Sequence, residues 1–345
     1  MDNQPFPLLY MPRRASINQM PCFVFLGEET GLSGALASRT AHVVHLTHND
    51  LDAVGADAIH RMRFGDDGVF TIWSSVGKFA ELFSLVAASP GKGDLLSISD
   101  LGCQKDAAKT AARAKKNGWV VEWRDHHRWR DEEIREVNEQ VPLLHIDTET
   151  CATGIVARDL APENPVAKEV ARVVCDYDLW KHADPRSAVL GQVLQRKKNR
   201  DHVRDCLAAG VFTDAQIEAE YADIKAEMDD AMAKSLRHVT FLGTTYRIAF
   251  APLYGYPSET AHYIRAKEGT DIEVIIGKDG KFSIRSVPPV SHLIAREFGG
   301  GGHPNAAGGS FSFTVVERFT WWLFKKSRHF DELVKIAEKY GKNPP

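Results

Sequence analysis

The residues of this chain best suited to chemistry are aspartates and histidines that stand directly after short apolar runs. The clearest group is Asp125-His126-His127, which follows the run at 120–123. A β-branched, apolar run of this kind predicts a buried parallel strand, whose carboxyl end would deliver the three side chains into a loop. There they could bind a metal ion or transfer protons. Adjacent histidines in a loop are more often ordinary surface residues, so the triplet alone is only suggestive.

Two further acid groups occupy similar positions along the chain. Asp50 and Asp52 follow an apolar run at 41–46, and Asp100 ends the run at 94–100. Two carboxylates at i and i+2 can face one pocket, an arrangement that suits hard divalent cations bound by oxygen. The alternative is a helix start, where Asp is favourable as an N-cap or in the first turn.

Two later stretches add to this set. Asp176 and Asp178 form another i, i+2 pair, and either of them could be structural. A glycine run at 299–302 is followed by His303 and by the small residues at 306–308. Glycines let backbone amides approach an anion closely, although a glycine run is usually a flexible loop. The adjoining histidine and small residues make this run a more specific signal.

A sheet is needed to bring these residues together. Strand and helix candidates alternate through the first half of the chain, which predicts an α/β fold with a parallel sheet and helices on both faces. Strands are expected at 41–46, 71–73, 94–100, 120–123 and 142–147, and helices at 78–88, 103–117, 150–157 and from Pro165 onward. Ligands bind such sheets outside the carboxyl ends of the strands. One edge of the sheet would therefore carry the Asp50 and Asp52 pair, Asp100 and the triplet Asp125-His126-His127.

The length of 345 residues exceeds what one ordinary core fills, so two domains are expected. We divide the chain into an extension of uncertain structure (1–40), a first α/β domain (41–189), a helical connector (190–236) and a smaller α/β domain with a C-terminal tail (237–345). The connector pattern predicts a long amphipathic helix at 213–236 with Thr213 as its cap. The basic run at 196–200 is interpreted as a solvated helix face, with a phosphate contact as the alternative.

The smaller domain has its own strand and helix candidates. Strands are expected at 245–251, 271–276 and 281–286, and helices at 258–267 and 291–298. The aromatic and basic tail at 319–326 is interpreted as a helix docked on the domain rather than as a platform that stacks bases, because aromatic side chains mostly pack.

Composition limits the class of protein. The chain is 43% hydrophobic and 26% charged, with a net charge of −3. These values describe a soluble globular protein, and no apolar stretch approaches the roughly 18 residues of a membrane span. A local basic groove for a short anionic substrate is compatible with this charge, whereas wrapping of long nucleic acid is not. The five cysteines show no metal-type spacing and predict reduced thiols in a cytoplasm, and the apolar patch at 22–26 is too short for a signal peptide.

Over about residues 41–313 the chain resembles the DHH-family phosphoesterases with a C-terminal DHHA1 domain, a superfamily that includes RecJ-type exonucleases, nanoRNases and family II pyrophosphatases. The motifs that carry the resemblance are, in order, 48–52, Asp100, Asp125-His126-His127, Asp176 with Asp178, and 300–303 running to 306–308. On this resemblance the first domain (41–189) is the DHH domain and the second (237–345) is the DHHA1 domain.

The resemblance implies a site for two metal ions, usually Mn²⁺, with Mg²⁺ or Co²⁺ as alternatives. The implied ligands are Asp50, Asp52, Asp100 as the bridge, His126, and one of Asp176 and Asp178. Several relatives place a metal-binding histidine where this chain has Leu46, so His48 or His45 would substitute for it. His127 would face the scissile phosphate, and Asp125 and Asp100 are counted with it as catalytic.

The resemblance also assigns substrate-binding residues to the second domain. Gly300, Gly301, Gly302 and His303 would hold a substrate phosphate or base. The stretch around Arg285 and Ser286 resembles the strand whose arginine grips the substrate in the nanoRNase-like branch.

Together these features predict a cytoplasmic, Mn-dependent phosphodiesterase that hydrolyses short RNA or DNA oligonucleotides or dinucleotides to nucleoside 5′-monophosphates, as a nanoRNase-like 3′–5′ exonuclease does. A cyclic-dinucleotide phosphodiesterase, a phosphoadenosine phosphatase and an exonuclease of longer strands are alternatives, of which the small second domain favours the short substrates. The glycine-His-Ala-Ala stretch disfavours a pyrophosphatase. A catalytically inactive nucleotide sensor, and acids that serve only as helix caps, are interpretations of other classes. No membrane partner is expected, and a homodimer is left open.

Overall fold

The computed structural model describes residues 29–342, and the chain divides into two compact units. The first unit comprises the described residues up to Ser187 together with Lys197–Phe212. The second comprises Ala188–Arg196 and the residues from Thr213 onward. The residues expected as a separate connector, 190–236, are thus shared between the two units.

The first unit contains a five-stranded sheet in the order β2-β1-β3-β4-β5, and every neighbouring pair is parallel. The strands are β1 (Val43–Thr47), β2 (Val69–Trp73), β3 (Leu95–Ser99), β4 (Val120–Asp125) and β5 (Leu143–Ile146). All five residues of the strand β1 are buried, as expected where helices cover both faces of a parallel sheet. The predicted α/β architecture is confirmed.

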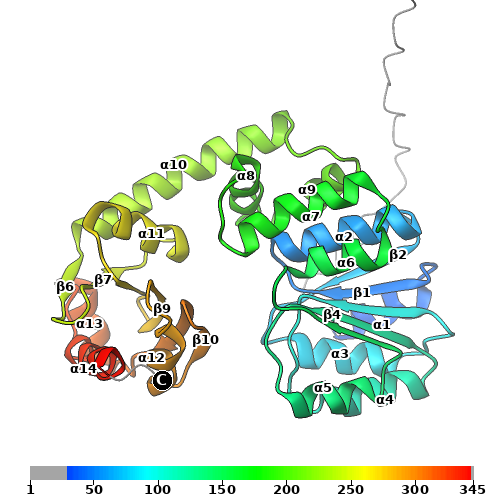
Figure 1. The fold of residues 1–345 in the computed structure, drawn as a ribbon, viewed down its shortest axis with the longest axis horizontal. Coiled ribbons are helices and arrows are strands. Elements are labelled where there is room, and N and C mark those ends of the chain that lie inside the picture. The colour runs from blue at the N-terminus through cyan, green and yellow to red at the C-terminus, as the bar shows by residue number, and fades with distance from the viewer. Residues whose placement is uncertain (1–28, 343–345) are drawn as a thin grey trace, which may run out of the picture. The chain divides into compact units, whose positions relative to one another are not determined.

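Helices cover both faces of this sheet (Figure 1). One face carries α2 (Leu51–Phe64), α6 (Ala152–Leu160), α7 (Pro165–Asp178) and α9 (Arg200–Ala208), and the other carries α1 (Glu29–Ser38), α3 (Phe79–Ala88), α4 (Ala107–Lys116) and α5 (Asp131–Asn138). Phe79 and Phe83 of α3 pack edge-on against Trp123 of β4, with ring centroids 5.5 and 5.6 Å apart. These aromatic contacts fix the strand that leads to the Asp125-His126-His127 triplet.

The part of the chain expected as a connector begins with α8 (Pro185–Val193) and a short 3₁₀ turn, η1 (Lys197–Asn199). The long helix predicted at 213–236 is α10 (Ala215–Arg237), and its N-cap is Asp214 rather than Thr213. The side chain of Asp214 accepts a hydrogen bond from the amide of Ile217, 2.8 Å away. Sequence could not separate two adjacent residues that both favour the N-cap position.

The second unit contains a six-stranded sheet in the order β10-β11-β9-β8-β7-β6, in which only β7 and β8 pair in parallel. Its strands are β6 (Thr240–Leu242), β7 (Ile248–Pro252), β8 (Ile272–Ile276), β9 (Lys281–Ser286), β10 (Gly301–His303) and β11 (Ala306–Ser310). The glycine run expected as a loop therefore leads into an edge hairpin.

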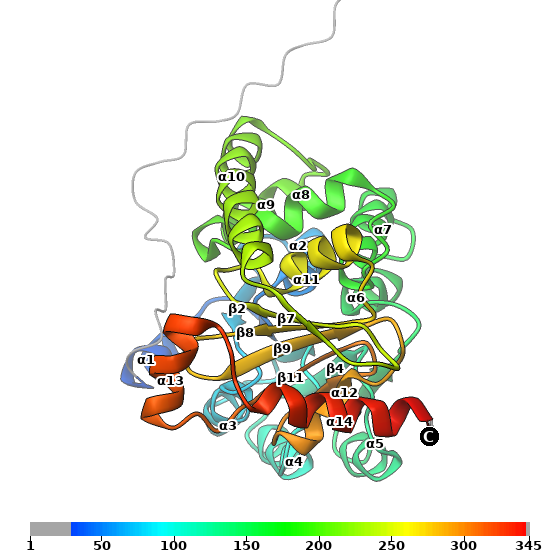
Figure 2. The ribbon, with the colours of Figure 1, turned by 90° about the vertical axis from the view of Figure 1, so that its left-hand side faces the viewer.

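Helices also cover both faces of the second sheet (Figure 2). They are α11 (Pro257–Glu268), α12 (Ser291–Glu297), α13 (Val315–Phe324) and α14 (His329–Lys342). Ala261 and Ile264 of α11 belong to one core, whereas Ile294, Trp321 and Leu333 of the other helices belong to a second core on the opposite face. The aromatic tail is thus a docked helix through Trp321, although Phe319 and Trp322 are exposed.

The prediction that the cysteines are reduced is wrong for one pair. Cys151, the N-cap of α6, forms a disulfide with Cys175 of α7. The two residues are 24 positions apart, and only the packing of α6 against α7 brings them together. Cys103 remains a thiol, and Cys22 lies outside the described residues.

Within residues 29–342, no helix is both long and apolar enough to cross a membrane.

Candidate active site

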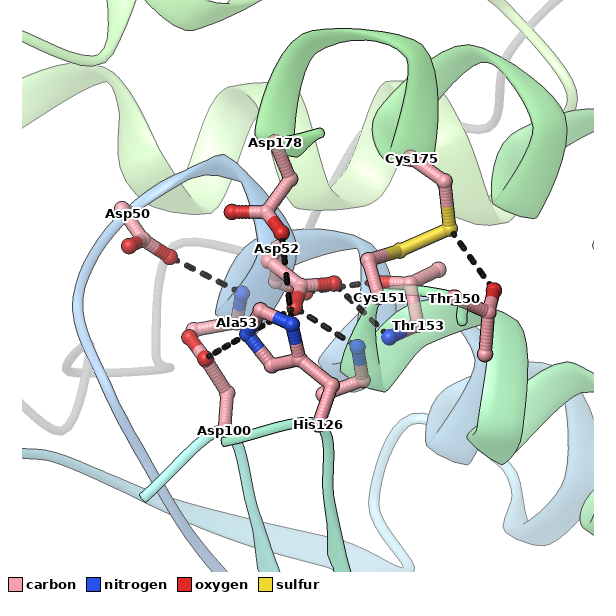
Figure 3. Close-up of a disulfide and its surroundings, with 11 residues drawn as sticks. Asp50, Asp52, Ala53, Asp100, His126, Thr150, Cys151, Thr153, Cys175 and Asp178 are labelled. Carbon is pink, nitrogen blue, oxygen red and sulfur yellow. Dashed lines mark hydrogen bonds and ion pairs between the residues drawn. A yellow bond between two sulfur atoms is a disulfide. The ribbon is translucent and has the colours of Figure 1, made fainter. Parts of the chain in front are cut away.

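Acidic and imidazole side chains from distant parts of the chain meet at the carboxyl ends of the strands. His48 and Asp50 follow β1, Asp100 follows β3, and His126 follows β4. Asp178, the last residue of α7, joins them from a helix (Figure 3). The edge predicted from the strand pattern is therefore where the structure gathers these side chains.

His126 lies at the centre of one group of acids. Its Nε2 is 3.3 Å from Oδ1 of Asp100 and 3.8 Å from Oδ2 of Asp52, and its Nδ1 is 3.7 Å from Oδ2 of Asp178. Burial opposes the charged imidazole, but the charges of Asp52 and Asp178 outweigh burial and raise the pKa of His126. The surrounding carboxyl groups therefore favour the protonated form of His126.

His48 takes the same part in a second group. Its Nδ1 is 2.8 Å from Oδ2 of Asp50 and 3.6 Å from Oδ2 of Asp100. Burial lowers the pKa of the imidazole, yet the interactions with the carboxyl groups of Asp100 and Asp50 outweigh that effect and raise the pKa of His48 to about 10. His48, rather than His45, is thus the histidine in this group.

The amino end of α6 holds Asp52 in place. The amides of Ala152 and Thr153 donate to Oδ2 and Oδ1 of Asp52 at 2.8 and 2.7 Å, and the hydroxyl of Thr153 donates to the Asp52 carbonyl at 2.6 Å (Figure 3). The amino end of a helix attracts anions because its amides and dipole point toward them. Asp52 is fully buried at its side chain, and that burial raises its pKa despite these hydrogen bonds.

This donor set fits divalent cations. Three groups of side chains each bring their ligand atoms within 4.8 Å of one another: His48 with Asp50 and Asp100, Asp52 with His126 and Asp178, and Asp100 with His126 and His127. Oδ2 of Asp100 and Oδ2 of Asp178 are buried without a hydrogen-bond partner among the described residues. Buried carboxylate oxygens normally have a partner, and a bound cation would supply one.

The same two acids, Asp100 and Asp178, also have raised pKa values. Burial, followed by the charges of Asp50 and Asp52, raises the pKa of Asp100 well above its usual range. Burial, followed by the charge of Asp52, has the same effect on the pKa of Asp178. Concentrated negative charge without a counterion disfavours ionisation, so a cation would lower these pKa values.

His127 has a different environment from its neighbour. Its Nδ1 is 2.8 Å from Oδ1 of the buried Asp125, whose Oδ2 accepts a hydrogen bond from Nε1 of Trp129 at 2.7 Å. Burial opposes the charged form, but the hydrogen bond to Asp125 prevails and raises the pKa of His127. Asp125 therefore orients the imidazole of His127 and favours its protonated form.

Two candidate ligands are placed elsewhere. Asp176 accepts hydrogen bonds from the amides of Ala183 and Asp184 and from the hydroxyl of Ser187, at 3.0, 3.1 and 2.6 Å, so it organises the loop after α7. Of the pair left open by the sequence, Asp178 is therefore the one that lies among the candidate ligands. His45 lies beneath the site, with its ring nitrogens 2.6 Å from Asp57 and 2.8 Å from Ser99.

Sequence reasoning did not identify the positively charged side chains at the rim of the site. The ammonium of Lys197 donates to the carbonyl of Asn49, next to Asp50, at 2.5 Å. Arg200 stacks over the ring of Trp73 at 5.2 Å. Both belong to the basic run at 196–200. The alternative interpretation of this run, as a phosphate contact, was the sequence feature that could have indicated their position.

The second unit presents the other candidate residues. Arg285 is partly buried and donates to the hydroxyl of Ser258 at 2.6 Å, and burial lowers its pKa. Ser286 is buried, and its hydroxyl donates to the Pro288 carbonyl at 2.6 Å, so the expectation that Ser286 contacts substrate does not fit its position.

The glycine stretch is exposed along β10, together with His303. A Cβ on Gly300 would come within 1.9 Å of the Gly308 carbonyl oxygen, and Gly302 has a φ of 141°, so the hairpin itself requires both glycines. A Cβ on Gly301 would meet no atom within 4 Å. Packing of the hairpin therefore does not require a glycine at position 301.

Comparisons with known proteins give no match among family models or curated proteins. Among solved structures, a DHH-domain protein described as belonging to a family of ribosomal proteins has a TM-score of 0.60 at 16% identity, covering 89% of each chain. A pGpG-specific phosphodiesterase from Vibrio cholerae has a TM-score of 0.55 at 10% identity, covering 86% of this chain and 99% of its own. RecJ from Thermus thermophilus, solved with Mn²⁺, has a TM-score of 0.52 at 15% identity, covering 92% of this chain and 54% of RecJ. The predicted DHH resemblance is thereby confirmed at the level of the fold: this chain has the DHH-domain fold.

Proposed function

We propose that the protein is a metal-dependent phosphodiesterase that hydrolyses short oligonucleotides or dinucleotides to nucleoside 5′-monophosphates. The observation that carries the proposal is the convergence of Asp52, Asp100 and Asp178 on His126, with two buried carboxylate oxygens that accept no hydrogen bond from the described residues. Such a site is costly to maintain unless cations bind there.

The side chains suit a pair of divalent cations. His48, Asp50 and Asp100 would hold one ion, and Asp52, His126 and Asp178 the other, with Asp100 placed to contact both. When bound, such ions supply Lewis-acid activation of water and neutralise charge at a phosphoryl group. His127, whose pKa Asp125 raises, would donate a hydrogen bond to a phosphoryl oxygen.

Several features support a short, anionic substrate. Lys197 adds positive charge beside Asp50, which would attract a phosphate next to the cleaved bond, and Arg200 of the same basic run lies over Trp73. In the second unit, the guanidinium of Arg285, the imidazole of His303 and the open backbone at Gly301 offer contacts for a terminal phosphate or base. The structurally similar Vibrio enzyme is described as specific for pGpG, a linear dinucleotide, which favours that class over long strands.

The test is a substrate panel assayed with Mn²⁺, with Mg²⁺ or Co²⁺, and with chelator. It comprises linear dinucleotides, cyclic dinucleotides, phosphoadenosine phosphate, pyrophosphate and single-stranded oligomers. We expect Mn²⁺-dependent release of 5′-monophosphates from the linear dinucleotides, with slower cleavage of longer strands. Preference for cyclic dinucleotides or phosphoadenosine phosphate would replace the substrate assignment. Tight nucleotide binding without turnover would instead support a sensor.

A further inference from the structure

The disulfide between Cys151 and Cys175 lies beside the candidate metal site (Figure 3). Its Cα atoms are 5.2 Å apart, Cys151 is fully buried and Cys175 is 9% exposed. It joins the N-cap residue of α6 to the last turn of α7. Both of these helix ends carry groups that position acids of the site.

On the α6 side, Cys151 is followed at once by the two residues that hold Asp52. The amides of Ala152 and Thr153 reach the two carboxylate oxygens of Asp52 at 2.8 and 2.7 Å. Because Cys151 is the N-cap of this helix, any shift of its backbone moves those two amides. The disulfide therefore restrains the group that orients Asp52.

On the α7 side, Cys175 precedes Asp178 by three residues in the same helix. Residues at i and i+3 lie on the same side of a helix, so fixing the Cβ of Cys175 also restrains the direction of Asp178. Asp178 and Asp52 face opposite nitrogens of one imidazole, at 3.7 and 3.8 Å from His126. The disulfide thus ties together the supports of two acids that surround His126.

Close packing around the disulfide transmits this restraint. A Cβ on Gly154 of α6 would come within 3.1 Å of Sγ of Cys175, and a Cβ on Gly55 of α2 would come within 2.8 Å of both Thr153 and Val174. The three helices therefore meet with almost no spare volume, whereas the carboxylates of Asp52 and Asp178 repel each other once they lose their protons to bind a cation. A covalent link between α6 and α7 opposes that repulsion.

We propose that the Cys151–Cys175 disulfide is a positioning element for cation binding by Asp52, His126 and Asp178. This inference rests on the metal site of the proposed function. Reduction by a trialkylphosphine breaks the S–S bond: the phosphine and one water give the phosphine oxide, and each cysteine sulfur gains one hydrogen. The reduced protein then binds Mn²⁺ more weakly because the supports of the two carboxylates are no longer linked.

The test measures Mn²⁺ affinity from the electron paramagnetic resonance signal of free Mn²⁺, so it does not depend on turnover. Four samples are compared: wild type as purified, wild type reduced by phosphine and freed of reductant, Cys151→Ser/Cys175→Ser, and Cys103→Ser. Thiol counting under denaturing conditions verifies the redox state of each sample. We expect reduction or double substitution to weaken Mn²⁺ binding at least tenfold, the usual effect of losing support behind metal ligands. Cys103→Ser should keep the wild-type affinity and the wild-type response to reduction.

Coupling between substitutions separates positioning from general loosening of the fold. Asp178→Asn and Asp50→Asn are each combined with the double serine variant. We expect the affinity losses to be non-additive with Asp178→Asn, whose support the disulfide fixes, and additive with Asp50→Asn. If the double variant does not fold, the phosphine-reduced wild type carries the same comparison, with Asp178→Asn and Asp50→Asn measured before and after reduction.

Two results would overturn the positioning role: equal Mn²⁺ affinity in the oxidised and reduced wild type, or titratable thiols at both cysteines in the protein as purified. Failure of the oxidised wild type to bind Mn²⁺ at all would instead refute the metal site and the proposed function with it. The two failures are therefore distinguishable.

Discussion

Replacing Asp100 by Asn should raise the stability of the metal-free protein while it abolishes metal binding and hydrolysis. Oδ2 of Asp100 is buried without a hydrogen-bond partner in the described chain, and burial with the charges of Asp50 and Asp52 raises the pKa of Asp100. A carboxyl group whose pKa is higher in the folded than in the unfolded chain lowers stability by about 1.4 kcal/mol for each pH unit above the unfolded pKa, up to the folded pKa, and the neutral amide of Asn has no such cost in chelator. Asn also tolerates the left-handed backbone of Asp100, whose φ is 54°.

The pH dependence of unfolding gives the sign of the effect. The folded state holds the proton of Asp100 more tightly than the unfolded chain, in which the pKa is near 3.8. In chelator, wild type therefore loses stability as the pH rises from the unfolded pKa through the raised folded pKa. Asp100→Asn removes one such group, so its stability should fall less over the same pH range.

Thermal unfolding with chelator and with Mn²⁺ measures both effects. A change of 1 kcal/mol shifts Tm by about 2–4 °C for a unit of this size, so Asp100→Asn should melt several degrees above wild type in chelator. At a Mn²⁺ concentration a hundredfold above Kd, the free energy of unfolding of wild type should rise by about 2.7 kcal/mol. The variant should gain little stability from Mn²⁺ and should lose hydrolytic activity. Asp176→Asn, which weakens only the loop after α7, is the control and should destabilise without changing the Mn²⁺-dependent gain. A variant that melts below wild type in chelator, or that keeps the full gain, would refute this reasoning.

Three further outcomes are expected. Mn²⁺ affinity should rise between about pH 6 and 8, and protons should be released on binding. The reason is that four candidate ligands have raised pKa values and must lose protons to bind metal: His48, Asp52, Asp100 and Asp178. Calorimetry in two buffers of different ionisation enthalpy measures the proton release, and an affinity that does not change with pH would contradict the prediction. Lys197→Met should raise KM for a dinucleotide several-fold with little change in kcat, since its ammonium lies at the rim beside Asp50; an unchanged KM would remove Lys197 from the substrate contacts. Gly301→Ala should weaken substrate binding while Tm stays constant, whereas Gly300→Ala should lower Tm because its Cβ meets the Gly308 carbonyl; binding unaffected by Gly301→Ala would show that substrate does not approach there.

The edge of the sheet could be predicted because Asp100 and His126 directly follow their strands, and His48 and Asp50 follow β1 within three residues. Asp100 ends the run that forms β3, and His126 follows β4, so strand order hardly affects the conclusion. Any parallel arrangement of these strands would bring the same ends to one side. That local relation between strand and side chain is visible in sequence alone.

The contribution of the helices could not be predicted in the same way. Whether Asp176 or Asp178 reaches the site depends on how α7 is rotated against its neighbours, because residues two apart point to different sides of a helix. The Cys151–Cys175 disulfide and the contact of Lys197 with Asn49 likewise depend on packing between segments distant in sequence. Periodicity gives the existence of these helices but not their rotation.

Helix capping and metal binding are not rival explanations of these acids, because they use different oxygen atoms. Oδ1 of Asp50 caps α2 by accepting from the amide of Ala53 at 3.2 Å, while its Oδ2 faces His48. Capping thus fixes the direction of the carboxylate and leaves an oxygen for a cation, as each carboxylate oxygen can accept more than one bond. Oδ2 of Asp100 and Oδ2 of Asp178 receive no such bond within the described residues. A purely structural role leaves those two buried oxygens without a hydrogen-bond donor, and it requires that chelation change neither melting temperature nor activity.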